Sequence, residues 1–195
     1  CHLWAAIGLD GQIVVYRESN VPHDVISKTW SPSTGTYGSA VDIATGLDAS
    51  HEPWPALLAL PDPDGGPDPI ILCAYWVADD STNEAQVEIM ASRDEGATWS
   101  LHARNVLPSS ITLNSGSPYY TLGRLRLVMC GAQVLLFAHA TSSSSVSSEK
   151  EHVFHYASAD YGSSFTLVST LHGYGFPDAV AIGPVAYLMV VEAAT

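Results

Sequence analysis

Cationic side chains are scarce in this sequence, which has seven Lys and Arg against 20 Asp and Glu and a formal net charge of −13 at pH 7. Nucleic-acid binding rests on the neutralisation of phosphates by basic groups, so the composition excludes nucleic acid as an expected partner. It also argues against an anionic glycan as the main ligand. No apolar run is long enough to span a bilayer, so we expect no membrane insertion.

Cysteine is rare as well, and helical periodicity is absent. Cys1, Cys73 and Cys130 have none of the spacings of a metal site, and the last two lie in apolar stretches typical of buried free thiols. No segment repeats its apolar residues with the period of a helix. Many Ser, Thr, Gly and β-branched residues accompany the sparse charge. We therefore expect an all-β protein that is secreted or exposed on a cell or virion surface.

One octapeptide occurs twice. Residues 92–99 read Ser-Arg-Asp-Glu-Gly-Ala-Thr-Trp, and residues 158–165 read Ser-Ala-Asp-Tyr-Gly-Ser-Ser-Phe. In this frame the Asp carboxylate accepts hydrogen bonds from backbone N–H groups of its own turn, the Gly adopts a φ that other residues resist, and the aromatic ring covers the hairpin base. The residues predicted to build these turns are Ser92, Asp94, Gly96, Thr98 and Trp99, and Ser158, Asp160, Gly162, Ser164 and Phe165.

The two copies define a repeat of about sixty residues. Asp94 and Asp160 lie 160 − 94 = 66 positions apart, and residues 31–37 form a degenerate third copy with Ser33 in place of the Asp. Four antiparallel strands per unit, the first two strongly apolar, indicate a propeller blade. The predicted architecture is an incomplete β-propeller of about three and a half blades, with approximate bounds 1–48, 49–113, 114–172 and 173–195. We expect the remaining blades or a partner chain to cover the open blade faces.

The octapeptides resemble the Asp-box, or bacterial neuraminidase repeat, family, and the resemblance covers essentially the whole chain. It implies a sialidase-like β-propeller in which the Asp boxes are structural turns away from the ligand face. The family's Arg-Ile-Pro motif falls on residues 53–55, where Pro53 stands in place of the catalytic Arg. The acid/base Asp of the family falls on Asp79 or Asp80, without the Arg that accompanies it there. The resemblance implies catalytic roles for these two residues only if the protein is an enzyme.

A second set of candidate residues, for ligand binding, is expected at strand ends on the face opposite the octapeptide turns. In a four-stranded blade the start of the first strand and the end of the second point to one face, which here collects carboxylates and aromatic rings. Neutral sugars are bound by such groups, because acceptors take the hydroxyls and rings cover the apolar sugar face. The alternative is that these are ordinary solvated loop residues. The candidate ligand-binding residues are Arg17, Glu18, Trp54, Tyr119, Tyr120, His139, Asp178 and Glu192.

An acidic turn is the one candidate metal site. Asp62, Asp64 and Asp68 place three carboxylates in a tight Pro- and Gly-rich segment, where carboxylate and carbonyl oxygens suit Ca²⁺. The segment departs from the twelve-residue calcium loop, since Gly66 stands where a third ligand belongs. A Pro-stiffened connecting turn is therefore the stronger interpretation, and we expect no other cofactor.

Three functions remain open on these residues. The first, which we favour, is a non-catalytic propeller module that recognises a carbohydrate or protein ligand, for example in a viral or cell-surface adhesion apparatus. We favour it because the octapeptide repeats of the scaffold are present, whereas Pro53 replaces the Arg of the Arg-Ile-Pro motif. The second is an exo-sialidase or another glycoside hydrolase whose remaining catalytic residues lie outside this segment. The third is a structural or assembly scaffold that uses its blade faces for subunit contact.

Overall fold

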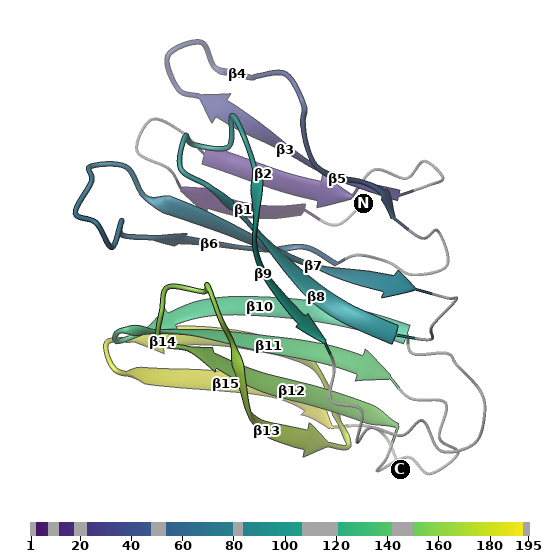
Figure 1. Ribbon diagram of the computed structural model, residues 1–195. Coiled ribbons are helices and arrows are strands. Elements are labelled where there is room, and N and C mark those ends of the chain that lie inside the picture. Colours follow the sequence, from purple (N-terminus) through teal and green to yellow (C-terminus); the bar gives the residue numbers. More distant parts are fainter. Residues whose placement is uncertain are drawn as a thin grey trace.

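The computed structural model describes residues 3–7, 12–17, 23–47, 54–79, 84–106, 121–141 and 150–192, and every regular element in these ranges is a β-strand. The strands form antiparallel sheets stacked one beside the next (Figure 1). This is the arrangement of β-propeller blades that the repeat predicts. The strands are β1 (Leu3–Ile7), β2 (Gln12–Arg17), β3 (His23–Ser31), β4 (Thr36–Tyr37), β5 (Val41–Leu47), β6 (Ala56–Leu60), β7 (Ile70–Asp79), β8 (Glu84–Ser92), β9 (Ser100–Val106), β10 (Thr121–Cys130), β11 (Gln133–Thr141), β12 (Glu151–Ser158), β13 (Thr166–His172), β14 (Tyr174–Ile182) and β15 (Val185–Glu192).

Sequence neighbours pair within each blade. The second blade has the strand order β6-β7-β8-β9 and the third β10-β11-β12-β13, while the described fourth blade is the hairpin β14-β15. Successive strands run in opposite directions, so each blade has two distinct ends. We call the end that carries the octapeptide turns the turn end, and the end where β7, β11 and β15 finish the loop end. None of the described segments forms a helix that could cross a bilayer.

The first blade differs from the second and third at residues 31–37, the degenerate third copy of the octapeptide. Here β3 pairs with the two-residue strand β4 and then separately with β5. Ser33 bonds only the hydroxyl of Ser31, with 2.9 Å between the two oxygens. A hydroxyl has one oxygen and cannot bridge two positions of the turn as a carboxylate does. The strand that follows this turn is β5, which begins at Val41.

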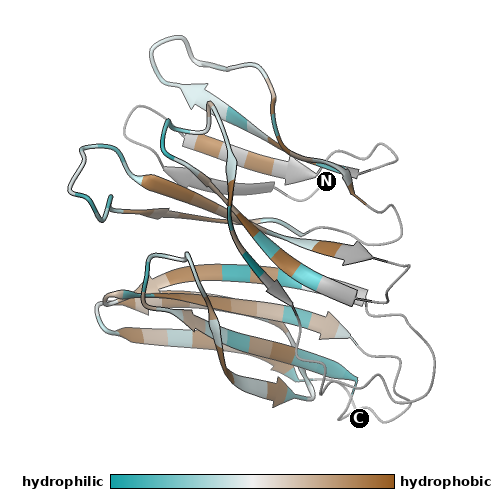
Figure 2. Ribbon diagram, in the orientation of Figure 1, coloured by the Kyte–Doolittle hydropathy of each residue, from teal (hydrophilic) through white to brown (hydrophobic). Residues whose placement is uncertain are grey.

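Apolar faces between blades form the core, and Figure 2 shows the hydrophobic residues following the inner strands. One face of β7 packs on the first blade through Ile71, Cys73 and Tyr75. The alternate residues of β7, including Leu72 and Trp76, pack on the third blade. Since β7 is buried on both faces, its run of apolar residues needs no alternation. Cys73 and Cys130 are free thiols as predicted, with Cys73 fully buried.

The two octapeptide turns make the same hydrogen bonds. In the first, Gly96 N donates to Ser92 Oγ at 2.8 Å, and Thr98 donates to the Asp94 carboxylate from its N–H at 2.8 Å and its hydroxyl at 2.6 Å. The second turn repeats these bonds at 2.7, 2.9 and 2.6 Å. Burial alone would raise the pKa of Asp94, but the bonds from Thr98 and Ser92 outweigh it and lower that pKa. The local chemistry read from the sequence is thus present at both sites.

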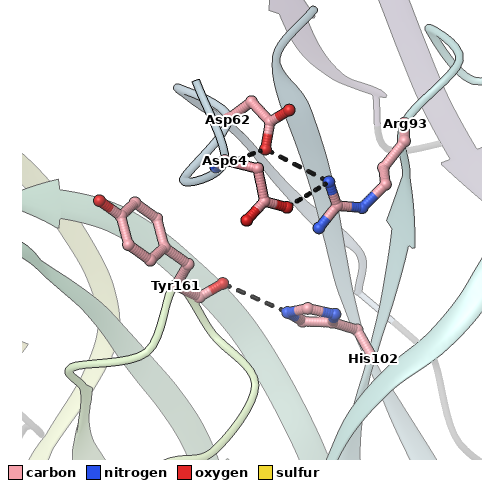
Figure 3. Close-up of polar contacts among 5 residues, drawn as sticks. All are labelled: Asp62, Asp64, Arg93, His102 and Tyr161. Carbon is pink, nitrogen blue, oxygen red and sulfur yellow. Dashed lines mark hydrogen bonds and ion pairs between the residues drawn. The ribbon is translucent and has the colours of Figure 1, made fainter. Parts of the chain in front are cut away.

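Each octapeptide turn also docks on the blade before it. Thr29 on β3 donates its hydroxyl to the Glu95 carbonyl at 3.1 Å, and His102 on β9 contacts the Tyr161 carbonyl through Nε2 at 3.3 Å (Figure 3). Trp99 reaches back in the same way, with its indole N–H 3.1 Å from Ser27 Oγ. The turns therefore join blades as well as closing hairpins.

Candidate functional site

Among the predicted site residues that the structure describes, Arg17, Trp54, Asp79, His139 and Glu192 lie at or near the loop end. Asp178 was predicted at the start of a first strand but lies in the middle of β14, where it pairs with Met189. Arg17 and Asp79 are the last residues of β2 and β7, and only their backbone is described. Glu192 ends β15 and is exposed. Glu18, Asp80, Tyr119 and Tyr120 lie outside the described residues. Trp54, His139 and Asp178 have described side chains, and His139 is at the centre of the site that follows.

His139 is a buried histidine in contact with a carboxylate. It lies near the end of β11 with a side chain that is 3% exposed, and its Nε2 is 2.5 Å from Glu151 Oε2 at the start of β12. The same oxygen accepts the Thr141 hydroxyl at 3.0 Å. An ionised carboxylate only accepts hydrogen bonds, so the hydrogen bond to an ionised Glu151 requires the tautomer of His139 with a proton on Nε2. The Glu151 side chain is 20% exposed, which leaves it accessible in part.

Two glycines make room for the His139 ring. A Cβ on Gly123 of β10 would lie 2.1 Å from His139 Nδ1, and a Cβ on Gly175 of β14 would lie 2.8 Å from Nε2 and 3.1 Å from Glu151 Oε2. Each glycine falls at a register shift, between Leu122 and Leu125 or at Gly175 itself. Bulges of this kind re-aim side chains next to functional sites. No residue with a Cβ fits at either position while the imidazole is in place.

Phe176 covers the imidazole with an aromatic ring. Its ring centroid is 5.0 Å from that of His139, tilted by 45°, and 53% of the residue is exposed. Its φ is +49°, which a bulky residue rarely adopts. Backbone strain of this sort persists where the surrounding structure determines it, and it clusters at functional sites. Phe176 is thus an exposed aromatic residue at the loop end, next in the chain to Gly175, which lies close to Glu151 Oε2.

Tryptophans of the second blade support the same region. Trp76 on β7 is buried and donates its indole N–H to the Gly123 carbonyl at 2.8 Å, which fixes the bulge that accommodates His139. Trp54, just before β6, packs at the edge of the core between the second and third blades and has a φ of +37°. The site thus draws on β7, β10, β11, β12 and β14, from three different blades.

Asp178 is held by an arginine of the neighbouring blade. Arg126 Nε on β10 lies 2.8 Å from Asp178 Oδ1 on β14. The hydrogen bond from Arg126 and the charges of Arg126 and Arg124 lower the pKa of Asp178, against a smaller opposing effect of burial. The carboxylate of this candidate ligand-binding residue is therefore already engaged in an ion pair between blades.

The carboxylates of the acidic turn contact an arginine that belongs to the first octapeptide turn. Figure 3 shows Arg93 of the octapeptide turn reaching Asp62 and Asp64, with its Nη1 3.3 Å from Asp62 Oδ1 and 3.8 Å from Asp64 Oδ2. Asp62 also accepts the N–H of Asp64 at 3.1 Å. Asp68 is exposed. Within the described residues no three His, Cys, Asp or Glu side chains are grouped so as to hold a metal ion, and the cation beside these carboxylates is a guanidinium.

Comparisons with known proteins follow the fold. No family model and no curated protein matches the sequence. Solved structures that match include an α-L-arabinofuranosidase, Arb93A, from Fusarium graminearum in complex with an iminosugar inhibitor, at a TM-score of 0.60 and 17% identity over 91% of this chain and 52% of that one. Another is a Penicillium chrysogenum α-L-arabinanase complexed with arabinobiose, at 0.58 and 15% over 91% and 53%. A Bombyx mori GH32 β-fructofuranosidase mutant with sucrose matches at 0.52 and 12% over 96% and 41%.

The fold is shared with β-propeller glycoside hydrolases. The chain spans about half the length of the two arabinan-directed structures it matches. Among the functions left open by the sequence, these neighbours agree better with the glycoside hydrolase than with the non-catalytic module. At such low identity they establish the fold and leave the activity to be argued from the site.

Two residues of the site were missed in the sequence. Glu151 is at the start of β12, directly after a Ser-rich stretch that offers no motif. Phe176 directly precedes Pro177, which removes a backbone donor, yet both residues lie within β14 (Tyr174–Ile182). The signal available was the pair Gly175-Phe176 before an apolar run, which is compatible with a bulge. His139 was found because it ends an apolar second strand.

Proposed function

We propose that the protein is a β-propeller glycoside hydrolase and that His139, Glu151 and Phe176 form part of its carbohydrate site at the loop end. The observation that carries the proposal is Glu151, a partly exposed carboxylate that contacts both His139 and Thr141. The exposed Phe176, whose backbone φ is +49°, packs on the same His139. A positioned carboxylate is the group that protonates or activates at a glycosidic bond. An adjacent ring accepts the apolar face of a sugar.

Glycoside hydrolysis uses two carboxyl groups on either side of the bond. We assign one role to Glu151. The second carboxylate is proposed from the two that end inner strands at the same end of the blades, Asp79 on β7 and Glu192 on β15. Of these, Asp79 is also the position that the sialidase resemblance implies.

The proposed substrate is a neutral sugar. Arg93, Arg104 and Arg126 each form an ion pair with a carboxylate of the chain itself, namely Asp62, Glu88 and Asp178. A sialic acid is clamped through its carboxylate by several arginines, because a guanidinium pairs with a carboxylate bidentately. Pro53, in place of the Arg of the Arg-Ile-Pro motif, argues in the same direction. Arabinofuranosides and other neutral glycosides are therefore the first substrates to try.

The experiment is a hydrolysis panel with chromogenic glycosides, including α-L-arabinofuranosides and sialosides. We expect turnover of a neutral glycoside, a loss of about a hundredfold or more in kcat/KM for Glu151→Gln, and a rise of about tenfold in KM for Phe176→Ala. Asp68→Asn at the turn end is the matched control and should leave both constants unchanged. Turnover that survives Glu151→Gln would contradict the assignment of Glu151.

The non-catalytic module remains the second candidate, because Pro53 replaces an arginine that sialidases of this resemblance use. It predicts binding of an oligosaccharide without turnover by any glycoside of the panel, with affinity reduced by Phe176→Ala. We also propose that the protein is related to the Asp-box family, because the two octapeptides have that family's residue pattern and each makes the same set of hydrogen bonds within its own turn.

A further inference from the structure

Two histidines of the third blade face each other across neighbouring strands. His152 on β12 and His172 on β13 are direct register partners in the antiparallel pair. Their Nδ1 atoms are 3.1 Å apart, and the rings meet edge to face with an interplanar angle of 88°. His152 is 5% exposed, and His172 is exposed. The proposed sugar site does not use either of them.

The separation of the two nitrogens suits a metal ion. Zinc binds imidazole nitrogen at about 2.0–2.1 Å, so an ion bonded to both Nδ1 atoms at their 3.1 Å separation would have an N–metal–N angle of about 95–100°. That angle lies between the roughly 90° that separates neighbouring ligands in a tetragonal site and the roughly 109° of a tetrahedral site. The hydrogen bond that now joins the rings needs one protonated and one free Nδ1. Binding would release that proton to solvent, and the ion would lie beside the line between the two nitrogens, not on it.

We propose that His152 and His172 form a two-histidine site for a borderline divalent ion, Cu²⁺, Ni²⁺ or Zn²⁺, with water completing the coordination on the exposed side of His172. Neutral imidazole is a common ligand for these three ions, whereas Ca²⁺ and Mg²⁺ prefer oxygen. In the described part of the chain no third His, Cys, Asp or Glu joins the pair into a larger cluster. The site is therefore a chelate of moderate affinity.

The surrounding structure holds the pair in place before any ion binds. The His152 ring stacks on Phe154 with 6.1 Å between centroids and an interplanar angle of 20°. Gly173, directly after His172, donates its N–H to the Glu151 carbonyl at 2.8 Å, which ties the two strands together beside the pair. A chelate whose ligands are already ordered loses little conformational entropy on binding.

The site is distinct from the other histidines of the blade. Alternate residues of a strand point to opposite faces, so Glu151 and His155 lie on the face of β12 away from His152. His155 stacks on Phe137 with 4.8 Å between centroids. His139, which contacts Glu151, lies on that other face as well. Loss of the metal site should therefore leave the proposed sugar site intact.

Ion binding would link the outer strand β13 to β12. An ion that binds only the folded chain stabilises it in proportion to the logarithm of its concentration over its Kd. β13 carries mostly exposed residues and has β12 as its pairing partner. It is therefore the strand whose attachment an ion should stabilise most.

The test is titration of the chain with Ni²⁺ or Zn²⁺ by calorimetry, and with Cu²⁺ by electron paramagnetic resonance. We expect one ion per chain and nitrogen hyperfine structure on Cu²⁺. His172→Gln keeps a polar partner for His152 at an exposed position and should weaken binding by at least about tenfold, since even the loss of an outer-shell partner costs that much. His102→Ala, a histidine on the equivalent outer strand β9, is the matched control and should bind as the parent does.

Absence of ion binding by the parent chain would overturn the proposal, and so would equal binding by the His172→Gln variant. Hydrolysis of the glycoside panel by His172→Gln at the parent rate is the expected companion result. It separates failure of the metal site from failure of the proposed hydrolase activity.

Discussion

Gly162 of the third blade lies against Leu72 of the second. A Cβ at Gly162 would be 2.8 Å from Leu72 Cδ1, and the φ of Gly162 is +88°. Gly96 occupies the same place one blade earlier, where a Cβ would lie 3.6 Å from Ile13 Cδ1 at a φ of +86°. The glycine of the octapeptide thus satisfies two demands at once, a left-handed backbone and close approach to the preceding blade.

Replacement of these glycines should separate the two demands. Gly35 has a φ of +66°, and a Cβ added there would have no atom within 4 Å. Gly35→Ala should therefore lower the free energy of unfolding by the backbone strain alone, about 1 kcal/mol. Gly162→Ala adds overlap with Leu72 and should lose about 2 kcal/mol more. Urea unfolding of the three alanine variants measures this, with Gly96→Ala expected between the other two. Equal losses at all three positions would show that contact with the preceding blade is unimportant.

Asp160 should make stability depend on pH. The hydrogen bond from Ser164, and then those from Ser158 and the backbone, lower the pKa of Asp160 below its ordinary value of 3.8 against opposing burial. A carboxyl whose folded pKa is lowered contributes stability that is present above 3.8 and is lost as pH falls through the folded pKa. Because Asp160 is exposed and its charge is screened by solvent, we expect Asp160→Asn to be less stable by no more than about 1 kcal/mol at pH 7.

The same variant checks the sign. Chemical unfolding of the parent and of Asp160→Asn from pH 7 to pH 2 should give a difference that shrinks toward acid. A difference that grows as pH falls would contradict the lowered pKa.

Gly123 and His139 should be coupled energetically. Gly123→Ala places a Cβ where the imidazole lies, so it should displace His139 and destabilise the chain by about 2 kcal/mol. Removing the ring with His139→Ala relieves that overlap, so the double variant should lose less than the sum of the single losses. We expect a coupling energy of about 1–3 kcal/mol in the double-mutant cycle. Strict additivity would mean that the ring and the glycine do not share this space.

Arg126→Met should return the pKa of Asp178 toward its ordinary value. The variant keeps an apolar stem but removes the charge and the hydrogen bond that are the largest cause of the lowered pKa. Because Asp178 is 48% exposed, the change in unfolding free energy should stay below about 1 kcal/mol. Carbon-detected NMR titration of the Asp178 carboxyl measures the pKa directly. An unchanged titration curve would remove Arg126 as its cause.

The features predicted correctly from the sequence are those set by local chemistry. The turns around Asp94 and Asp160 close through bonds within eight residues, so their geometry was readable without tertiary structure. The inner strands were equally legible, since their apolar runs are long and bounded by turn residues. The apolar run Ala56–Leu60, which ends at Pro61, forms β6.

The candidate site was less predictable, because it depends on contacts between strands and blades. The pairing of His139 with Glu151 comes from the register of β11 and β12, and the φ of Phe176 comes from a bulge in β14. Asp178 was predicted as a ligand-binding carboxylate, but it lies in the middle of β14, where Arg126 reaches it from 52 residues away in sequence. Such partners are fixed by packing, and single-sequence patterns do not contain them.

The central claim is that a neutral sugar binds at the loop end beside His139, Glu151 and Phe176. It is tested most directly by NMR titration of the isotope-labelled chain with neutral oligosaccharides, arabinobiose among them. We expect saturable shifts at the end of β11 and at the starts of β12 and β14, and none at the octapeptide turns around Asp94 and Asp160. Shifts confined to those turns, or no shifts with any sugar of the panel, would contradict it.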